Sequence, residues 1–299
     1  MFEALRIYYP ELVPFVRAFY LDTGQLIFNG LDGVTMLESA EGSGQQGDPI
    51  ASFLYAIMTK PTWDAVALEF KDKSAVAVYA DNGYFVVRNQ VDIPAVLASI
   101  VARLAKVGLS VDMKQTEVFS FSGISASVNA ALHPDVVRCQ DGIIILGAPV
   151  GTLEFMRAEV KRNFEEKLKE VFPKLPALHN PQMSNLLSMF SLHQRFTFLL
   201  RTVPTAAVMS AAVSTDSALL ASFREINDIT EAELPAGSLR ARQAALAARD
   251  GGFGVGQLQD TAAVASVASV MASIPLVAAR LGFRGSEIAD IIEVACREI

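Results

Sequence analysis

The sequence predicts an α+β fold in its first half and an all-helical second half. In residues 1–150, apolar runs at helical spacing alternate with short β-rich runs that contain Asn-Gly turn signals. From Gly151 onward, the apolar periodicity is helical and only short breaks interrupt it. We therefore place a boundary near residue 150, which gives the domains 1–150 and 151–299.

The composition is that of a core-rich globular chain. Of the 299 residues, 52% are hydrophobic and 19% are charged, and the formal net charge is -7. Because nucleic-acid-binding proteins usually carry a surplus of basic residues, this balance argues against tight independent binding, although it leaves room for a local basic groove. The two cysteines lie far apart and the three histidines lack ligand spacing, so we predict no disulfide framework and no zinc site.

The termini and apolar stretches indicate an intracellular protein, either cytoplasmic or nuclear. The N-terminal sequence lacks the basic-then-apolar pattern of a secretion signal. Residues 261–279 are uncharged, but a stretch of Ala, Ser and Val with Pro275 inside is more typical of a buried helix than of a membrane span. We therefore predict no membrane association.

Periodicity and cap signals predict the order of elements. In the first half, the predicted elements are one helix or two short ones over 2–20, a hairpin over 21–38 with a turn at Asn29-Gly30, a helix from the N-cap Asp48, a hairpin over 73–87, a helix from Asp92 that stops at Gly108, and strands at Val118–Phe121 and Ile143–Pro149. In the second half, the predicted helices are 152–172, 180–201, 205–230, 238–249, 258–280 and 285–298. Thr152 is the predicted N-cap of the first of them.

The stretch Ala75–Val87 carries the strongest candidate for a functional side chain. Its two β-rich runs are joined by Asn82-Gly83, and Asn and Gly tolerate the positive φ of a tight hairpin turn. Both arms are apolar, so we expect the hairpin to be buried on both faces. Asp81 would stand beside the turn, where its carboxylate can either hold a metal ion or hydrogen-bond its own turn.

A glycine-rich loop precedes the helix at Asp48. Gly42, Gly44 and Gly47 would let the backbone approach a ligand closely. The spacing of these glycines is a weak signal by itself, and no Lys follows to form a phosphate-binding P-loop. A plain capped loop therefore remains an open alternative.

The chain carries four short motifs in the order Glu41–Pro49, Tyr79–Asn82, Gly108–Glu117 and Ile145–Pro149. In this order they resemble the motifs of reverse transcriptases from non-LTR, LINE-like retrotransposons. The later strings Leu200–Pro204 and Arg249–Gly254 are similar to strings after the polymerase core of such elements. The resemblance covers most of the chain. It implies a partial polymerase palm, with a small antiparallel sheet and packed helices, followed by a helical thumb and connecting region.

The resemblance also implies roles for individual residues, a Mg²⁺ cofactor, and an RNA or DNA template–primer and a deoxynucleoside triphosphate as partners. The implied nucleotide- and template-binding residues are Gly44, Gln45, Gln46, Gly47, Asp48 and Tyr79; the implied catalytic residues are Asp81, Asn82 and Lys114, with Asp81 as metal ligand and Lys114 near the nucleotide phosphates; the implied primer grip is Leu146 and Gly147.

Two departures from the family bear on activity. Asn82 stands where the family has a second Asp, and an uncharged amide is a poorer ligand for a hard cation. The family's first catalytic Asp lies on a strand upstream of the helix at 2–20, so we expect the chain to be an N-terminally truncated form. Because phosphoryl transfer uses two Mg²⁺ ions about 4 Å apart, held by carboxylates from two strands, we expect no polymerisation by the isolated chain and an exposed edge on the hairpin.

The leading hypothesis is therefore a reverse-transcriptase-like nucleotidyltransferase domain that is inactive alone. Three alternatives remain open. The chain can be a non-catalytic remnant of a domesticated retroelement that binds nucleic acid or a protein. It can be an active polymerase whose missing motif comes from a complementing chain. It can also be an unrelated α+β enzyme.

Overall fold

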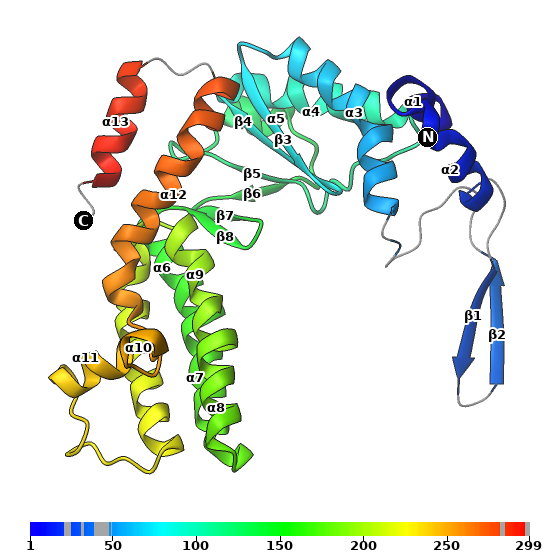
Figure 1. The fold of residues 1–299 in the computed structure, drawn as a ribbon. Helices are drawn as coiled ribbons and strands as arrows, with labels where there is room; N and C mark the ends of the chain where they lie inside the picture. The colour runs from blue at the N-terminus through cyan, green and yellow to red at the C-terminus, as the bar shows by residue number, and fades with distance from the viewer. Residues whose placement is uncertain (21–24, 31–32, 39–47, 49, 282–284, 297–299) are drawn as a thin grey trace. The chain divides into compact units, whose positions relative to one another are not determined.

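The computed structural model describes residues 1–299 except 21–24, 31–32, 39–47, 49, 282–284 and 297–299. The fold is mixed α+β, as predicted, with small antiparallel sheets and many helices (Figure 1). The chain divides into two compact units. We call Met1–Thr116 with Ile124–Val137 the N-terminal unit, and Glu117–Gly123 with Arg138–Ile299 the helical unit.

The N-terminal unit combines hairpins with short helices. Its elements are α1 (Phe2–Tyr8), α2 (Val13–Tyr20), β1 (Gln25–Gly30), β2 (Gly33–Glu38), α3 (Ala51–Glu69), β3 (Ser74–Tyr79), β4 (Asn82–Val87), α4 (Ile93–Ala105) and α5 (Ala126–Ala131). The region 2–20 forms two short helices joined by a 3₁₀ turn, and the hairpins predicted over 21–38 and 73–87 are confirmed. Helix α5 was not predicted.

Helix α4 follows its predicted pattern closely. Val96, Ile100 and Leu104, which recur at helical spacing, are its buried residues. Gly108 adopts a φ of 79°, and the N–H of Leu109 donates to the carbonyl of Leu104 at 3.0 Å. Gly108 therefore ends the helix by taking the left-handed conformation that glycine tolerates best.

Two apolar clusters hold the N-terminal unit together. In the first, Leu5 of α1 and Val16 of α2 pack with Leu54 and Ile57 of α3. The second joins the C-terminal half of α3 to α4 and to hairpin β3–β4. Its buried members are Val66, Phe70, Val96, Ile100 and Leu104, and Val76, Phe85 and Val87 pack against them. Helix α3 thus belongs to both clusters.

Short strands lead into the helical unit. Strand β5 (Glu117–Phe119) pairs with β6 (Val137–Cys139), and β7 (Gly142–Ile145) pairs with β8 (Ala148–Gly151). The prediction of a single strand over Ile143–Pro149 is wrong, because a turn at Leu146 and Gly147 divides this run into two paired strands. Every sheet in the described part of the chain is two-stranded.

The predicted helices of the second half are confirmed. They are α6 (Leu153–Val160), α7 (Glu166–Val171), α8 (Pro181–Leu187), α9 (His193–Thr202), α10 (Thr205–Ile226), α11 (Leu239–Ala245), α12 (Leu258–Leu281) and α13 (Gly285–Cys296). One turn of π-helix joins α6 to α7 and another joins α8 to α9. Thr152 caps α6 as predicted, since its hydroxyl accepts the N–H of Phe155.

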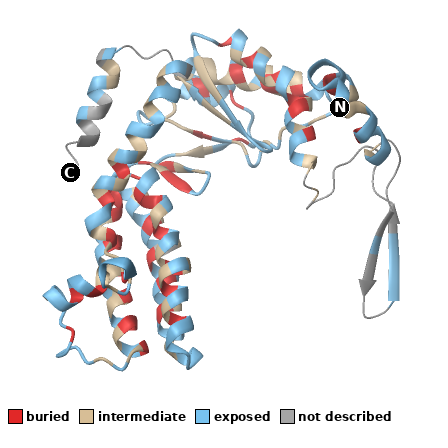
Figure 2. Cartoon of the chain, viewed as in Figure 1, coloured by how far each residue is buried: buried red, intermediate tan, exposed pale blue. Residues whose placement is uncertain are grey.

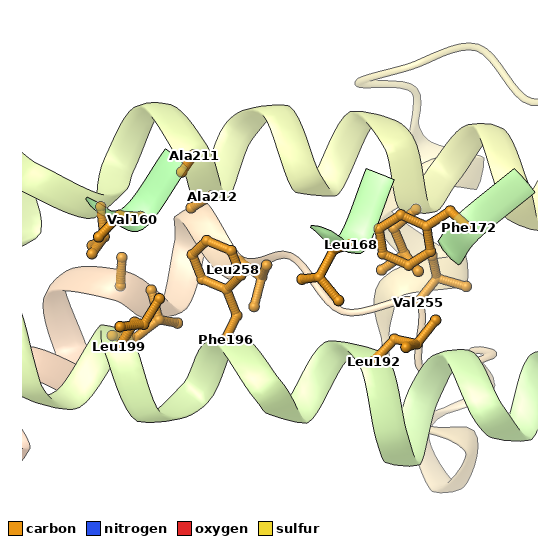
Figure 3. Packing of buried hydrophobic residues seen from close by; sticks show 14 of the residues in the cluster. Val160, Leu168, Phe172, Leu192, Phe196, Leu199, Ala211, Ala212, Val255 and Leu258 are labelled. Carbon is orange, nitrogen blue, oxygen red and sulfur yellow. The ribbon is translucent and has the colours of Figure 1, made fainter. Parts of the chain in front are cut away.

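The core of the helical unit lies between α6, α9, α10 and α12. Val160, Phe196, Leu199, Ala212 and Leu258 come from these four helices and are almost fully buried (Figure 3). The small side chains of α10 allow its neighbours to approach closely, and α12 contacts both α9 and α10. Buried residues accordingly line these helices in Figure 2.

Helix α12 differs from its prediction as a buried helix. Leu258, Ala262 and Ser266 are buried against the core, but Val264, Met271 and Leu276 are exposed. By length and composition alone, Leu258–Ala279 and Thr205–Ile226 could each cross a membrane. Of the most apolar stretch of each helix, 11% of the first and 50% of the second is buried within the protein. The prediction that 261–279 is buried is therefore wrong, because the core ends after the first turns of α12.

Candidate functional site

Asp81 lies at the tip of hairpin β3–β4, in a two-residue turn. Tyr79 pairs with Asn82, so Ala80 and Asp81 form the connection. Ala80 adopts a positive φ of 51°. The predicted turn at Asn82-Gly83 is wrong, because both residues lie inside β4 and pair with β3. Asp81 is therefore part of the turn itself.

One face of the hairpin packs on α3. The rings of Phe85 and Trp63 lie 6.0 Å apart, and a Cβ built on Gly83 would lie 3.4 Å from the Trp63 ring. The opposite face is open, with Tyr79 63% and Val86 70% exposed. The prediction of burial on both faces is wrong, because the described part of the chain places no element over this face.

The surroundings of Asp81 are sparse. Its carboxylate is exposed and accepts a long hydrogen bond of 3.4 Å from the amide of Asn82. Burial, and to a lesser extent the charge of Asp81, raises the pKa of the Tyr55 phenol on α3. The structure thus brings together Asp81, Asn82 and Tyr55, and sequence reasoning overlooked Tyr55.

This donor set does not fit a two-magnesium centre. Such a centre needs carboxylates from separate strands, whereas the hydrogen bond that Asp81 accepts within the described ranges comes from the amide of Asn82. In the described ranges, no group of three or more His, Cys, Asp or Glu side chains could hold a metal ion. We therefore assign no catalytic step through Mg²⁺ to these residues.

Asp48 is held in place before α3 but does not cap it. The N-cap is Ile50 and the helix begins at Ala51, so the predicted N-cap is wrong. The Asp48 carboxylate accepts the hydroxyl of Tyr20 and, at 2.9 Å, the N–H of Ile50. The Tyr20 hydrogen bond lowers the pKa of Asp48, and the same bond raises the pKa of Tyr20 to about 12. Because its carboxylate binds the N–H of Ile50, two residues further along the chain, Asp48 fixes the segment that leads into α3.

The glycine-rich loop and Lys114 are the remaining predicted site positions of the N-terminal unit. Gly44, Gln45, Gln46 and Gly47 lie outside the described residues. Lys114 lies on an exposed turn after α4, where its N–H donates to the Asp112 carboxylate at 2.9 Å. Asp112 also accepts the Gln115 side chain, so this acidic residue organises the turn that carries Lys114.

Leu146 and Gly147 form the turn of hairpin β7–β8. Their φ values of 50° and 86° are both positive, as in a type I′ turn. Leu146 is 51% exposed, and a Cβ on Gly147 would lie 3.8 Å from the ring of Phe198 on α9, which is 42% exposed. The turn therefore adjoins an exposed aromatic side chain.

Arginines flank Phe198 on the exposed side of α9. Arg195 and Arg201 lie three residues before and after it, a spacing that places all three side chains on neighbouring parts of one helix face. Both arginines are exposed, and neither forms an ion pair within the described ranges. Sequence reasoning overlooked this surface, although aromatic and basic residues at i and i+3 were visible in the sequence.

Comparison with known proteins gives no match. No family model matches the chain, and neither does a curated protein or a solved structure. The functional interpretation therefore rests on the ordered motifs and on the local geometry described above.

Proposed function

We propose that this chain is a reverse-transcriptase-like protein that binds a primer–template but does not complete nucleotidyl transfer with the described residues alone. The observation that carries the proposal is the position of Asp81 on the tip of a hairpin whose helix-facing side packs on α3. In the family that the motifs resemble, a hairpin of this kind presents a carboxylate to the nucleotide.

The open face of hairpin β3–β4 supports a binding role. Tyr79 is exposed on this face, two residues from Asp81. A nucleobase can stack on an exposed aromatic ring, and this contact tolerates any base. Among the described residues, in contrast, Asp81 belongs to no group of three or more His, Cys, Asp or Glu side chains that could hold a metal ion, whereas a two-metal centre needs carboxylates from separate strands. Binding without catalysis is thus the function that these residues support best.

The surface around Phe198, defined by Leu146, Gly147, Arg195, Phe198 and Arg201, supports contact with a nucleic-acid backbone. It combines an exposed ring with two guanidinium groups that form no ion pair with any residue the structure describes. Arginine binds phosphate through parallel N–H donors, and each such contact releases counterions from the nucleic acid. A local surface of this kind is compatible with a net charge of -7 for the whole chain.

The test is the affinity of the purified chain for a fluorescently labelled RNA–DNA primer–template, measured by anisotropy between about 50 and 200 mM salt. We expect binding that weakens with salt. Replacing both arginines, Arg195→Ala with Arg201→Ala, should weaken binding for every sequence and lower the salt slope by about 2, because each phosphate contact contributes about 1.

The matched control removes two exposed arginines from elsewhere in the helical unit, Arg242→Ala with Arg249→Ala. This variant has the same net charge as the test variant, so a difference between them reports position and not overall charge. An intact chain that shows no salt-dependent binding would refute the proposal. Equal losses in the two double variants would refute the assignment of this surface.

A further inference from the structure

Strand β4 leaves one side of its backbone without partners. The two-residue turn makes Tyr79 and Asn82 a hydrogen-bonded pair, and the N–H of Arg88 donates to the carbonyl of Lys73 at 2.8 Å. Hydrogen-bonded and non-bonded pairs alternate along an antiparallel ladder. The N–H and C=O groups of Gly83, Phe85 and Val87 therefore point away from β3, and within the described ranges they have no hydrogen-bond partner.

This edge lacks the features that usually protect an exposed strand. Over its length β4 contains no charged residue and no proline, whereas natural edges commonly carry Lys or Pro, or are covered. Strand β3 packs against α3, whereas β4 packs mainly against β3. Val86 adds an exposed apolar side chain beside the edge. The strand is thus available for pairing with another strand.

We propose that β4 pairs in antiparallel fashion with β4 of a second copy of the chain, about a two-fold axis at Phe85. In this register Phe85 faces Phe85 of the second copy, and Gly83 faces Val87. Every outward-pointing N–H and C=O of the strand then finds a partner. A two-fold axis makes the same surface serve both copies, which is the commonest arrangement in oligomers.

Charge complementarity favours a second copy of the chain as the partner of the β4 edge. The register places Arg88 opposite Asn82 of the second copy and next to its Asp81. Arg88 is exposed and forms no ion pair within the described part of its own chain. Within one chain, Arg88 and Asp81 lie at opposite ends of β4, about 24 Å apart at about 3.4 Å per residue. Pairing between copies brings these opposite charges together at both ends.

The apolar side chains agree with the same register. Val86 would lie beside Tyr84 of the second copy, on the open face of the hairpin. Pairs of an aromatic and a β-branched residue across strands stabilise antiparallel sheets. The resulting four-stranded sheet would cover the exposed edge of each copy. This inference does not depend on the proposed function, because it uses the backbone groups, charges and apolar side chains of the hairpin and no ligand.

The test is analytical sedimentation of the full chain over a range of concentrations. The intact chain is compared with variants in which the charges of Arg88 and Asp81 are reversed, singly and together. The intact chain should pass from 32.2 kDa to twice this mass as concentration rises. Arg88→Glu and Asp81→Lys, each alone, should weaken the dimer about tenfold or more, because each brings like charges together. The double variant should restore dimerisation to within about threefold of the intact chain.

Lys106→Glu is the matched control, because it makes the same charge change at an exposed position of the N-terminal unit. Hydrogen exchange adds a second readout. The amides of Phe85 and Val87 should become protected as concentration rises, whereas those of Tyr84 and Val86 should be protected throughout. A chain that stays at 32.2 kDa, or a double variant no better than the single ones, would overturn the proposal. Either result would leave the test of nucleic-acid binding unaffected.

Discussion

Ala80 and Leu146 each occupy a left-handed backbone conformation at a two-residue turn, with φ values of 51° and 50°. This conformation costs about 1–2 kcal/mol for a residue with a Cβ. The paired strands on either side hold both residues there. At β3–β4 the positive φ falls on Ala80 and not on the Asn-Gly pair that usually occupies such turns.

Two substitutions test the position of this turn. Ala80→Gly should stabilise the chain by up to about 1 kcal/mol, because glycine adopts a positive φ without steric cost. Gly83→Ala should be mildly destabilising, because its new Cβ would lie 3.0 Å from the Phe85 ring. Urea unfolding followed by Trp63 fluorescence measures both. A turn at Asn82-Gly83 would instead make Gly83→Ala the costly change and give Ala80→Gly no benefit.

The Asn-Gly pairs show why the sequence does not locate the hairpin turns. Asn29-Gly30 and Asn82-Gly83 both match the sequence signal of a hairpin turn, yet both pairs lie within paired strands. The apolar arms correctly indicated that hairpins exist. The exact turn depends on which register buries Val76, Phe85 and Val87 against α3 and α4, and that packing is a tertiary property.

At the scale of elements, Asp216 fixes the start of α12 from a different helix. Its carboxylate, on α10, accepts the N–H groups of Leu258 at 2.8 Å and of Gln259 at 3.0 Å. These are two of the N-terminal donors that no helix can satisfy internally. Asp216 is also the only charged residue in α10 before Arg224, which was a visible but unused signal in the sequence.

Asp216 should make stability depend on pH. Burial raises its pKa to about 6, against 3.8 for the free group. The folded chain therefore binds this proton more tightly than the unfolded chain, and the contribution to stability is complete below about pH 4 and lost as pH rises through about 6. We expect this loss to reach about 1–2 kcal/mol after solvent screening. Asp216→Asn, measured by urea unfolding and circular dichroism, should abolish the dependence.

Asp216→Ala separates the cap from the charge. Without an acceptor, the N–H groups of Leu258 and Gln259 lose their partner, so this variant should be about 1 kcal/mol less stable than Asp216→Asn at every pH. If Asp216→Asn retains the pH dependence of the intact chain between about pH 4 and 6, another group is responsible.

Helices were more predictable than burial at this scale. Periodic apolar residues and the caps at Thr152 and Gly108 located α4 and α6. The sequence also predicts a buried helix over 261–279, because these residues are uncharged and mostly Ala, Ser and Val. The position along α12 at which burial stops is set by its contacts with α9 and α10, and these contacts depend on the three-dimensional packing of the helices.

At the scale of the whole molecule, the predicted site residues are divided between two compact units. Asp48, Asp81 and Lys114 belong to the N-terminal unit, and Leu146 and Gly147 to the helical unit. The resemblance to reverse-transcriptase motifs selected these residues, but the local signals misplaced the cap at Asp48, the turn at Asp81 and the break between strands at Leu146 and Gly147. The ligand set around Asp81 could not be predicted in this way, since it depends on strands brought together from distant parts of a sequence.

Primer extension by the full chain tests the central claim most directly. With a labelled primer–template, all four deoxynucleotides and either Mg²⁺ or Mn²⁺, we predict no extension above that of Asp81→Ala. Asn82→Asp should give none either, because one turn with two adjacent carboxylates still lacks a ligand from a second strand. Extension by the intact chain that Asp81→Ala abolishes would contradict the account, because it would show that this chain holds a complete catalytic site.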